Sequence, residues 1–160
     1  PHLRTEPIRG NVETRMGKVD AGLFDATLLA EAGLTRLDMK DVTRYPISEE
    51  IIVPAPGQAA IAVQTRDEDG ELQTLLQQIH DAKTEREVTI ERSLLKRLGG
   101  GCALPLGCVC HIEGETAELR VFYANASGTE HYLATHRPPL SDIDTLLSQL
   151  IERLQHITTA

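Results

Sequence analysis

The sequence predicts an α/β architecture in its first third and a compact α+β domain in its last half. Three observations support this prediction. Short helical and strand-like segments alternate as far as about residue 56. Residues 107–137 then hold three strand-like runs separated by turn sequences. A long helix with one continuous apolar face follows them near the end of the chain.

The elements expected in the first third are short. Helices are expected over 14–23 and 31–38, and apolar strands over 24–30 and 50–53. Proline and glycine in residues 53–57 break both periodicities, and a β-compatible run follows over 58–66. We therefore expect the chain to cross between subdomains near residue 55.

Two helices are expected next. The apolar residues of 72–79 recur at helical spacing and lie on one face. A second helix is expected over 83–98, where Thr84 and Glu87 have the spacing of a capping box. The three glycines of 99–101 would end this helix.

The remaining elements form the predicted α+β unit, from about 82 to 160. Its three strands are broken at 113–115 and 126–129, whose glycines favour turns between antiparallel neighbours. Ser141 and Asp144 form a second capping box at the start of the last helix. We expect a three-stranded antiparallel sheet with helices on one face.

Composition and charge exclude several classes of protein. No apolar run approaches the roughly 20 residues that cross a bilayer, so we expect no membrane insertion. A net charge of −8 argues against nucleic-acid binding, and any anionic ligand needs a local group of arginines. Cys102, Cys108 and Cys110 form a poor disulfide framework, which indicates a reducing compartment, the cytoplasm. Because the chain starts with Pro1 and no targeting segment follows, we expect an internal boundary of a longer protein.

Cys102 follows three consecutive glycines, which remove side-chain bulk around its thiol and permit unusual backbone angles. Residue type alone leaves three interpretations open. The cysteine could be a small buried residue after a helix stop, or an accessible thiol beside a bulky group. It could also bind a metal with Cys108, Cys110 and His111, but their spacing lacks the paired knuckles of structural zinc sites, so we expect no metal.

A group of arginines in the first third is the second candidate site. Arg9 and Arg15 flank the start of the first expected helix, and Arg36 follows in the second. Guanidinium groups bind carboxylates through paired hydrogen bonds, and a helix N-terminus also favours an anion. Isolated arginines are mostly solvated surface residues, which is the alternative.

The order of four motifs over about 100 residues resembles the porphobilinogen deaminase family. The matching stretches are Arg9-Gly10-Asn11-Val12-x-Thr14-Arg15, residues 24–37, Pro54-Ala55-Pro56-Gly57-Gln58-Ala59-Ala60, and Glu91-Arg92 continuing to Gly100-Gly101-Cys102-x-x-Pro105-x-Gly107. Beyond Gly107 the likeness is mainly one of pattern.

The resemblance implies a site and a cofactor. Cys102 would attach a covalent dipyrromethane through a thioether. Arg9, Arg15 and Arg36 would hold the carboxylates of this cofactor and of the substrate porphobilinogen. Gln58 would donate a hydrogen bond to a substrate carboxylate, with a solvated turn residue as the alternative. An arginine at the position of Arg92 affects the cofactor or its neighbours, with a helix-surface ion pair as the alternative.

The resemblance also implies an organisation for the parent enzyme, a monomeric hydroxymethylbilane synthase that joins four porphobilinogen molecules and releases ammonia. Residues 1–54 would be the rear of a second, periplasmic-binding-protein-like α/β domain, 55–81 a return segment to the first domain, and 82–160 the cofactor-attachment domain. The family's catalytic aspartate lies in the missing N-terminal half, so we expect no catalytic residue here and no activity from this chain alone. The rival interpretation is a non-catalytic interaction fragment whose cysteine loop is structural.

Overall fold

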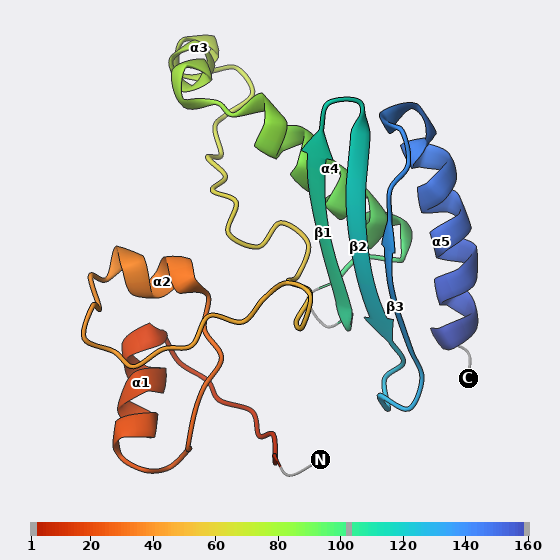
Figure 1. Ribbon diagram of the computed structural model, residues 1–160. Helices are drawn as coiled ribbons and strands as arrows, with labels where there is room; N and C mark the ends of the chain where they lie inside the picture. The colour runs from red at the N-terminus through yellow and green to blue at the C-terminus, as the bar shows by residue number, and fades with distance from the viewer. Residues whose placement is uncertain (1–2, 102–103, 159–160) are drawn as a thin grey trace. The chain divides into compact units, whose positions relative to one another are not determined.

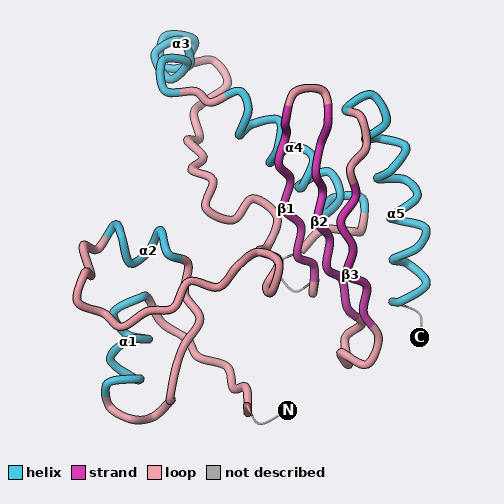
Figure 2. Tube along the Cα trace, in the orientation of Figure 1, coloured by secondary structure: helices cyan, strands magenta, loops and turns pink. Residues whose placement is uncertain are grey.

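The computed structural model describes residues 3–101 and 104–158, and it separates into two compact units, Pro1–Pro46 and Ile47–Ala160. Figures 1 and 2 show the elements of each unit. None of the helices in the described part of the chain has the length and apolar character of a bilayer-spanning helix. The expected domain boundaries at residues 54 and 81 remain predictions.

The first unit contains two short helices, α1 (Val12–Asp20) and α2 (Glu31–Arg36), as expected. They contact each other where a Cβ atom on Gly33 would lie 3.2 Å from Val12 Cγ2. Leu34 is the buried residue of α2. The close approach at Gly33 therefore brings the two helices of this unit together.

The second unit is the predicted α+β domain. Strands β1 (Leu106–Glu113), β2 (Thr116–Ala124) and β3 (His131–His136) form an antiparallel sheet in the order β1-β2-β3. Glu113 pairs with Thr116, so a two-residue turn containing Gly114, at φ 58°, joins β1 to β2. The prediction of three strands and of both turns is confirmed.

Helices α4 (Ala82–Arg97) and α5 (Ile143–Thr158) supply the apolar residues that cover this sheet. In Figure 1, α4 crosses behind β1 and α5 lies beside β3. Alternate strand residues face the helices, as period-two alternation requires. The largest fully buried side chains of this core are Leu94, Cys108, Cys110, Leu119, Val121, Leu147 and Leu154. A separate helix, α3 (Gly70–Leu76), continues into a 3-10 turn, η1 (Gln77–Ile79), as the helical spacing of 72–79 indicates.

Both expected capping boxes are wrong. Helix α4 begins one residue earlier, and its N-cap is Asp81, which accepts the Thr84 N–H at 2.7 Å. At α5 a 3-10 turn, η2 (Leu140–Asp142), precedes the helix, and Asp144 pairs with Arg97 of α4. At α4, Asp81 takes the capping role that the local pattern assigned to Thr84. At α5, Asp144 forms an ion pair with α4 in place of a capping box with Ser141.

The strands expected over 24–30, 50–53 and 58–66 are also absent from the structure. A strand needs a neighbour for its backbone hydrogen bonds, and no described segment pairs with 24–30 or 58–66. Their apolar side chains are consequently exposed, as Leu28 at 66% and Ile61 at 75% illustrate. Residues 50–53 approach β1, but Pro54 follows them and has no N–H to extend a ladder.

Replacing Leu119 with Ala should lower the free energy of unfolding by about 2–5 kcal/mol, because it leaves a cavity at a fully buried position. Leu133 on the adjacent strand is 48% exposed, and Leu133→Ala should cost less than about 1 kcal/mol. Urea denaturation followed by circular dichroism measures both losses. Equal losses would contradict the placement of the core on one face of the sheet.

Candidate functional site

The first motif builds the start of α1. The Asn11 side chain caps the helix, and its Oδ1 accepts hydrogen bonds from the N–H of Thr14 at 2.8 Å and from its hydroxyl at 2.7 Å. Gly10 has φ 125°, and a Cβ atom there would lie 2.7 Å from Thr14 Cβ. The turn therefore requires glycine at position 10, and Asn11 and Thr14 stabilise it by their hydrogen bonds.

The two arginines of this motif flank that turn, and hydrogen bonds hold the backbone around them. Arg15 Nε donates to the Gly10 carbonyl at 2.8 Å, while Arg9 is exposed and its carbonyl accepts from Lys18 Nζ at 2.9 Å. Arg36 is exposed in the last turn of α2. Within 3–101 and 104–158, no carboxylate pairs with any of these three arginines. Their positive charge is thus uncompensated in a chain of net charge −8.

The glycines before Cys102 end α4 in a defined way. Gly99 and Gly100 have φ values of 95° and 45°, in the left-handed region. The Gly100 N–H donates to Leu95 O at 3.0 Å and the Gly99 N–H to Lys96 O at 3.2 Å, the bonding pattern of a Schellman motif. Cys102 itself lies outside the described residues. In the described part of the chain, no group of three metal-ligating side chains occurs.

The other two cysteines are core residues. Cys108 and Cys110 are 0% and 1% exposed and point into the helix-covered side of the sheet. Burial raises the pKa of the Cys110 thiol to about 12, with smaller contributions from Glu91 and Glu87, and burial also raises the pKa of Cys108. Neither thiol is a nucleophile near neutral pH.

Two glutamates of α4 and one carbonyl cover the free edge of β1. Strand β1 is an edge strand, and such edges expose N–H groups to unwanted pairing. Here three of those N–H groups have acceptors. Pro54 O accepts from Cys108 at 2.8 Å, Glu91 Oε1 from Cys110 at 2.9 Å, and Glu87 Oε1 from Ile112 at 2.7 Å.

Glu91 also holds the loop that contains Gln58. Its second oxygen, Oε2, accepts the Gly57 N–H at 2.7 Å, and the side chain is 6% exposed. Burial raises the pKa of Glu91 against the opposing effect of the Gly57 and Cys110 donors. Gln58 is exposed immediately after the anchored amide.

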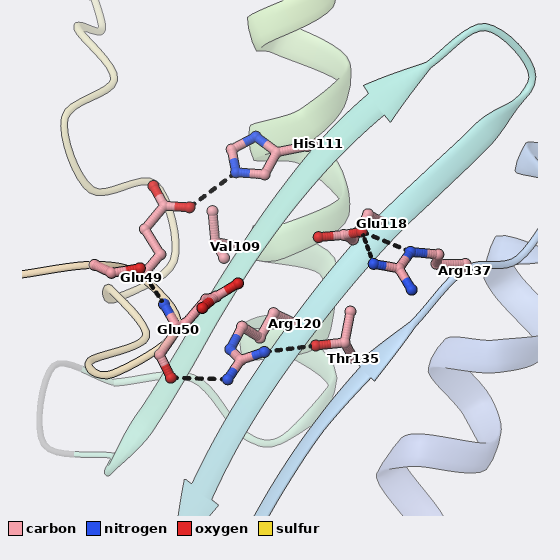
Figure 3. Close-up of a pocket in the computed structure, with 9 residues that line it drawn as sticks. Glu49, Glu50, Val109, His111, Glu118, Arg120, Thr135 and Arg137 are labelled. Carbon is pink, nitrogen blue, oxygen red and sulfur yellow. Dashed lines mark hydrogen bonds and ion pairs between the residues drawn. The ribbon is translucent and has the colours of Figure 1, made fainter.

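The uncovered face of the sheet carries a polar hollow of about 310 Å³ (Figure 3). His111 Nε2 lies 2.9 Å from Glu49 Oε2, and Arg120 donates to the Glu50 carbonyl at 2.8 Å. The other guanidinium nitrogen of Arg120, Nη1, donates to Thr135 Oγ1 at 2.8 Å. Residues 49–50 are therefore tied to the sheet by two contacts.

Sequence patterns did not single out Glu91 as the acceptor of hydrogen bonds from two segments, or Glu49 as the partner of His111. One signal was present, since Glu87 and Glu91 are four residues apart on the same helix as the apolar Leu94. Arg92 is exposed on α4 and has no ion-pair partner within the described ranges. Its predicted role therefore stays a prediction.

In a Cys102→Ser variant, the two remaining thiols should resist iodoacetamide while the chain is folded. At pH 8 a thiol with a pKa of about 12 is thiolate in only about one part in ten thousand, and the core also excludes the reagent. Intact mass should show no adduct in buffer and two adducts in urea. Rapid labelling of the folded variant would contradict the burial of Cys108 and Cys110.

The pair of His111 and Glu49 should stabilise the second unit more when His111 is protonated than when it is neutral. The hydrogen bond that Glu49 accepts from His111 is the main cause that raises the His111 pKa, with charge effects from Glu49, Glu87 and Glu118. A raised histidine pKa stabilises the fold fully below 6.5, and this stabilisation is lost as pH rises through the folded pKa.

The difference in Tm between wild type and Glu49→Gln should therefore be largest below pH 6.5 and shrink above the folded pKa. Proton NMR should show a lower His111 pKa in this variant. Glu113→Gln, on the same strand, is the control and should leave that pKa unchanged. A Tm difference that does not vary with pH would argue against the pair.

Comparison with known families agrees with these features. A model described as "Porphobilinogen deaminase, dipyromethane cofactor binding domain" matches residues 1–74, and one described as "Porphobilinogen deaminase, C-terminal domain" matches residues 85–137. Together they confirm the resemblance and the predicted fold class, a cofactor-binding domain followed by an α+β domain. Enzymes of this family are hydroxymethylbilane synthases of porphyrin biosynthesis. The chain belongs to the porphobilinogen deaminase family.

Proposed function

We propose that this chain supplies the cofactor anchor and part of the carboxylate clamp of a hydroxymethylbilane synthase. In this proposal Cys102 forms the thioether to dipyrromethane, and Arg9, Arg15 and Arg36 bind the carboxylates of the cofactor and of porphobilinogen. Gln58 donates a hydrogen bond to a substrate carboxylate. When bound, the dipyrromethane supplies the free pyrrole carbon to which substrate units are joined.

The uncompensated arginines of the first unit are the observation that supports the clamp most strongly. Each pyrrole of the substrate class brings two carboxylates, and each charge-assisted hydrogen bond contributes about 1.5–3 kcal/mol. Nearby charges outweigh distant ones because salt screens interactions beyond about 8–10 Å. A few unpaired guanidinium groups therefore suffice for a polyanion despite the acidic composition.

Two features support Cys102 as the attachment residue. The other two cysteines are buried and have raised pKa values, which leaves Cys102 as the remaining candidate nucleophile. The helix stop at Gly99 and Gly100 ends α4 just before it. A reducing compartment, the cytoplasm, would keep this thiol free for the thioether.

We also propose that this chain needs the rest of its enzyme for turnover. Loss of ammonia from porphobilinogen leaves a cationic methylene-pyrrole, which a positioned carboxylate stabilises. The resemblance assigns that aspartate to a part of the family outside the four motifs. Asp25 is exposed, and the resemblance gives it no catalytic role.

The test is attachment of the cofactor in the complete enzyme. Ehrlich's reagent should colour the wild-type protein and not Cys102→Ser, and intact mass should differ by one dipyrromethane beyond the substitution. Cys108→Ser is the matched control and should retain the cofactor wherever it folds. Cofactor on the Cys102→Ser protein would refute the assignment.

A further inference from the structure

We propose that Glu91 is a positioning residue for substrate binding, because it fixes the Gln58 loop to the helix that leads to the cofactor cysteine. This inference rests on the proposed role of Gln58. It adds a residue that touches neither substrate nor cofactor and acts through the backbone of the loop.

Two anchors hold the Gln58 loop, and both lie just before Gln58 in the chain. The Pro54 carbonyl accepts the Cys108 N–H at 2.8 Å. The Gly57 N–H donates to Glu91 at 2.7 Å. Directly after the second anchor, the Gln58 N–H closes a turn onto Ala55 O at 2.9 Å. The backbone of Gln58 therefore has little freedom once both anchors are made.

The anchoring requires the particular backbone of Gly57. Its φ of 74° is open to glycine and strained for other residues, and this conformation lets its N–H reach the buried carboxylate. A Cβ atom at Gly57 would lie 3.7 Å from Val88 Cγ1 of α4. Val88 of α4 thus lies close beside Gly57, next to the hydrogen bond.

Glu91 is suited to this task because its two oxygens serve two segments. Oε1 accepts from Cys110 of β1 and Oε2 accepts from Gly57. Glutamine at this position has one oxygen for two donors, and its NH₂ group would face an N–H group. The loop should consequently be released without removal of any apolar contact.

Glu87 is a matched control on the same helix. It is half-buried, accepts one hydrogen bond from Ile112 of the same strand edge, lies 3.7 Å from Lys83 Nζ and is not bonded to the Gln58 loop. Glutamine can replace it and keep that single bond through its amide oxygen. Any effect common to both glutamine variants is therefore an effect of removing a carboxylate charge from α4.

The experiment is a double-mutant cycle in the complete enzyme with Gln58→Ala, Glu91→Gln and their combination, with Glu87→Gln as the control. Gln58→Ala and Glu91→Gln should each raise KM for porphobilinogen by about tenfold, the equivalent of one hydrogen bond to a charged group, with little change in kcat. The double variant should be no worse than Gln58→Ala alone. Glu87→Gln should keep the wild-type KM.

Amide exchange in the 160-residue chain gives a readout that does not depend on activity. The Gly57 amide should exchange about tenfold faster in Glu91→Gln, because its acceptor is lost, and at the wild-type rate in Glu87→Gln. A purely structural role of Glu91 would reduce the amount of active enzyme, and so kcat, while leaving KM unchanged.

The outcomes separate the two proposals. A wild-type KM for Gln58→Ala would overturn the role of Gln58, and the inference with it. A raised KM for Gln58→Ala with additive or absent effects of Glu91→Gln would overturn the inference alone. If Glu91→Gln does not fold, Val88→Ala loosens the loop from its apolar side, and faster Gly57 exchange with an unchanged KM in that variant would also overturn it.

Discussion

The carboxylate of Glu91 accepts hydrogen bonds from two segments that are far apart in the sequence, the loop at Gly57 and strand β1 at Cys110. One helical turn earlier, Glu87 accepts a single hydrogen bond from Ile112 of the same strand. Residues two apart on a strand are separated by about 6.6 Å, and residues four apart on a helix by about 6 Å. The two glutamates of α4 therefore match successive outward N–H groups of β1, and the strand edge is closed without a further strand.

This edge is also where two of the sequence motifs meet. The motif at residues 54–60 approaches β1 closely, and a Cβ atom on Gly107 would lie 2.5 Å from Val53 O. Gly107 belongs to the other motif, as does Glu91, which binds Gly57. The burial of an ionised glutamate is costly, as its raised pKa reflects, and the two N–H donors offset that cost. Some motif residues therefore hold two segments of the chain together, as Gly57 and Glu91 do.

The two units differ in the charged and reactive side chains that they expose. The first unit has little core, and although Arg4 and Arg44 pair with glutamates, no carboxylate among the described residues pairs with the three motif arginines of this unit, whose charge is available to a ligand. The second unit contains the apolar core, and it renders two of the three thiols inert by burial. On its open face the charges of Glu118 and Arg137 are paired with each other at 2.6 Å, and His111 is paired with Glu49. The charges on the open face of the sheet are thus paired, whereas those of the three motif arginines are not.

The sequence by itself determined the elements whose signals are local. The three strands, their glycine turns and the apolar faces of α4 and α5 were predicted because period and turn chemistry act over a few residues. The family motifs identified the arginines and Cys102 as candidates. Only the tertiary structure decided whether apolar runs such as 24–30 became strands, because a strand needs a partner that the run itself does not encode. It alone revealed the role of Glu91, since that carboxylate is stabilised in the core by donors 34 and 19 residues away.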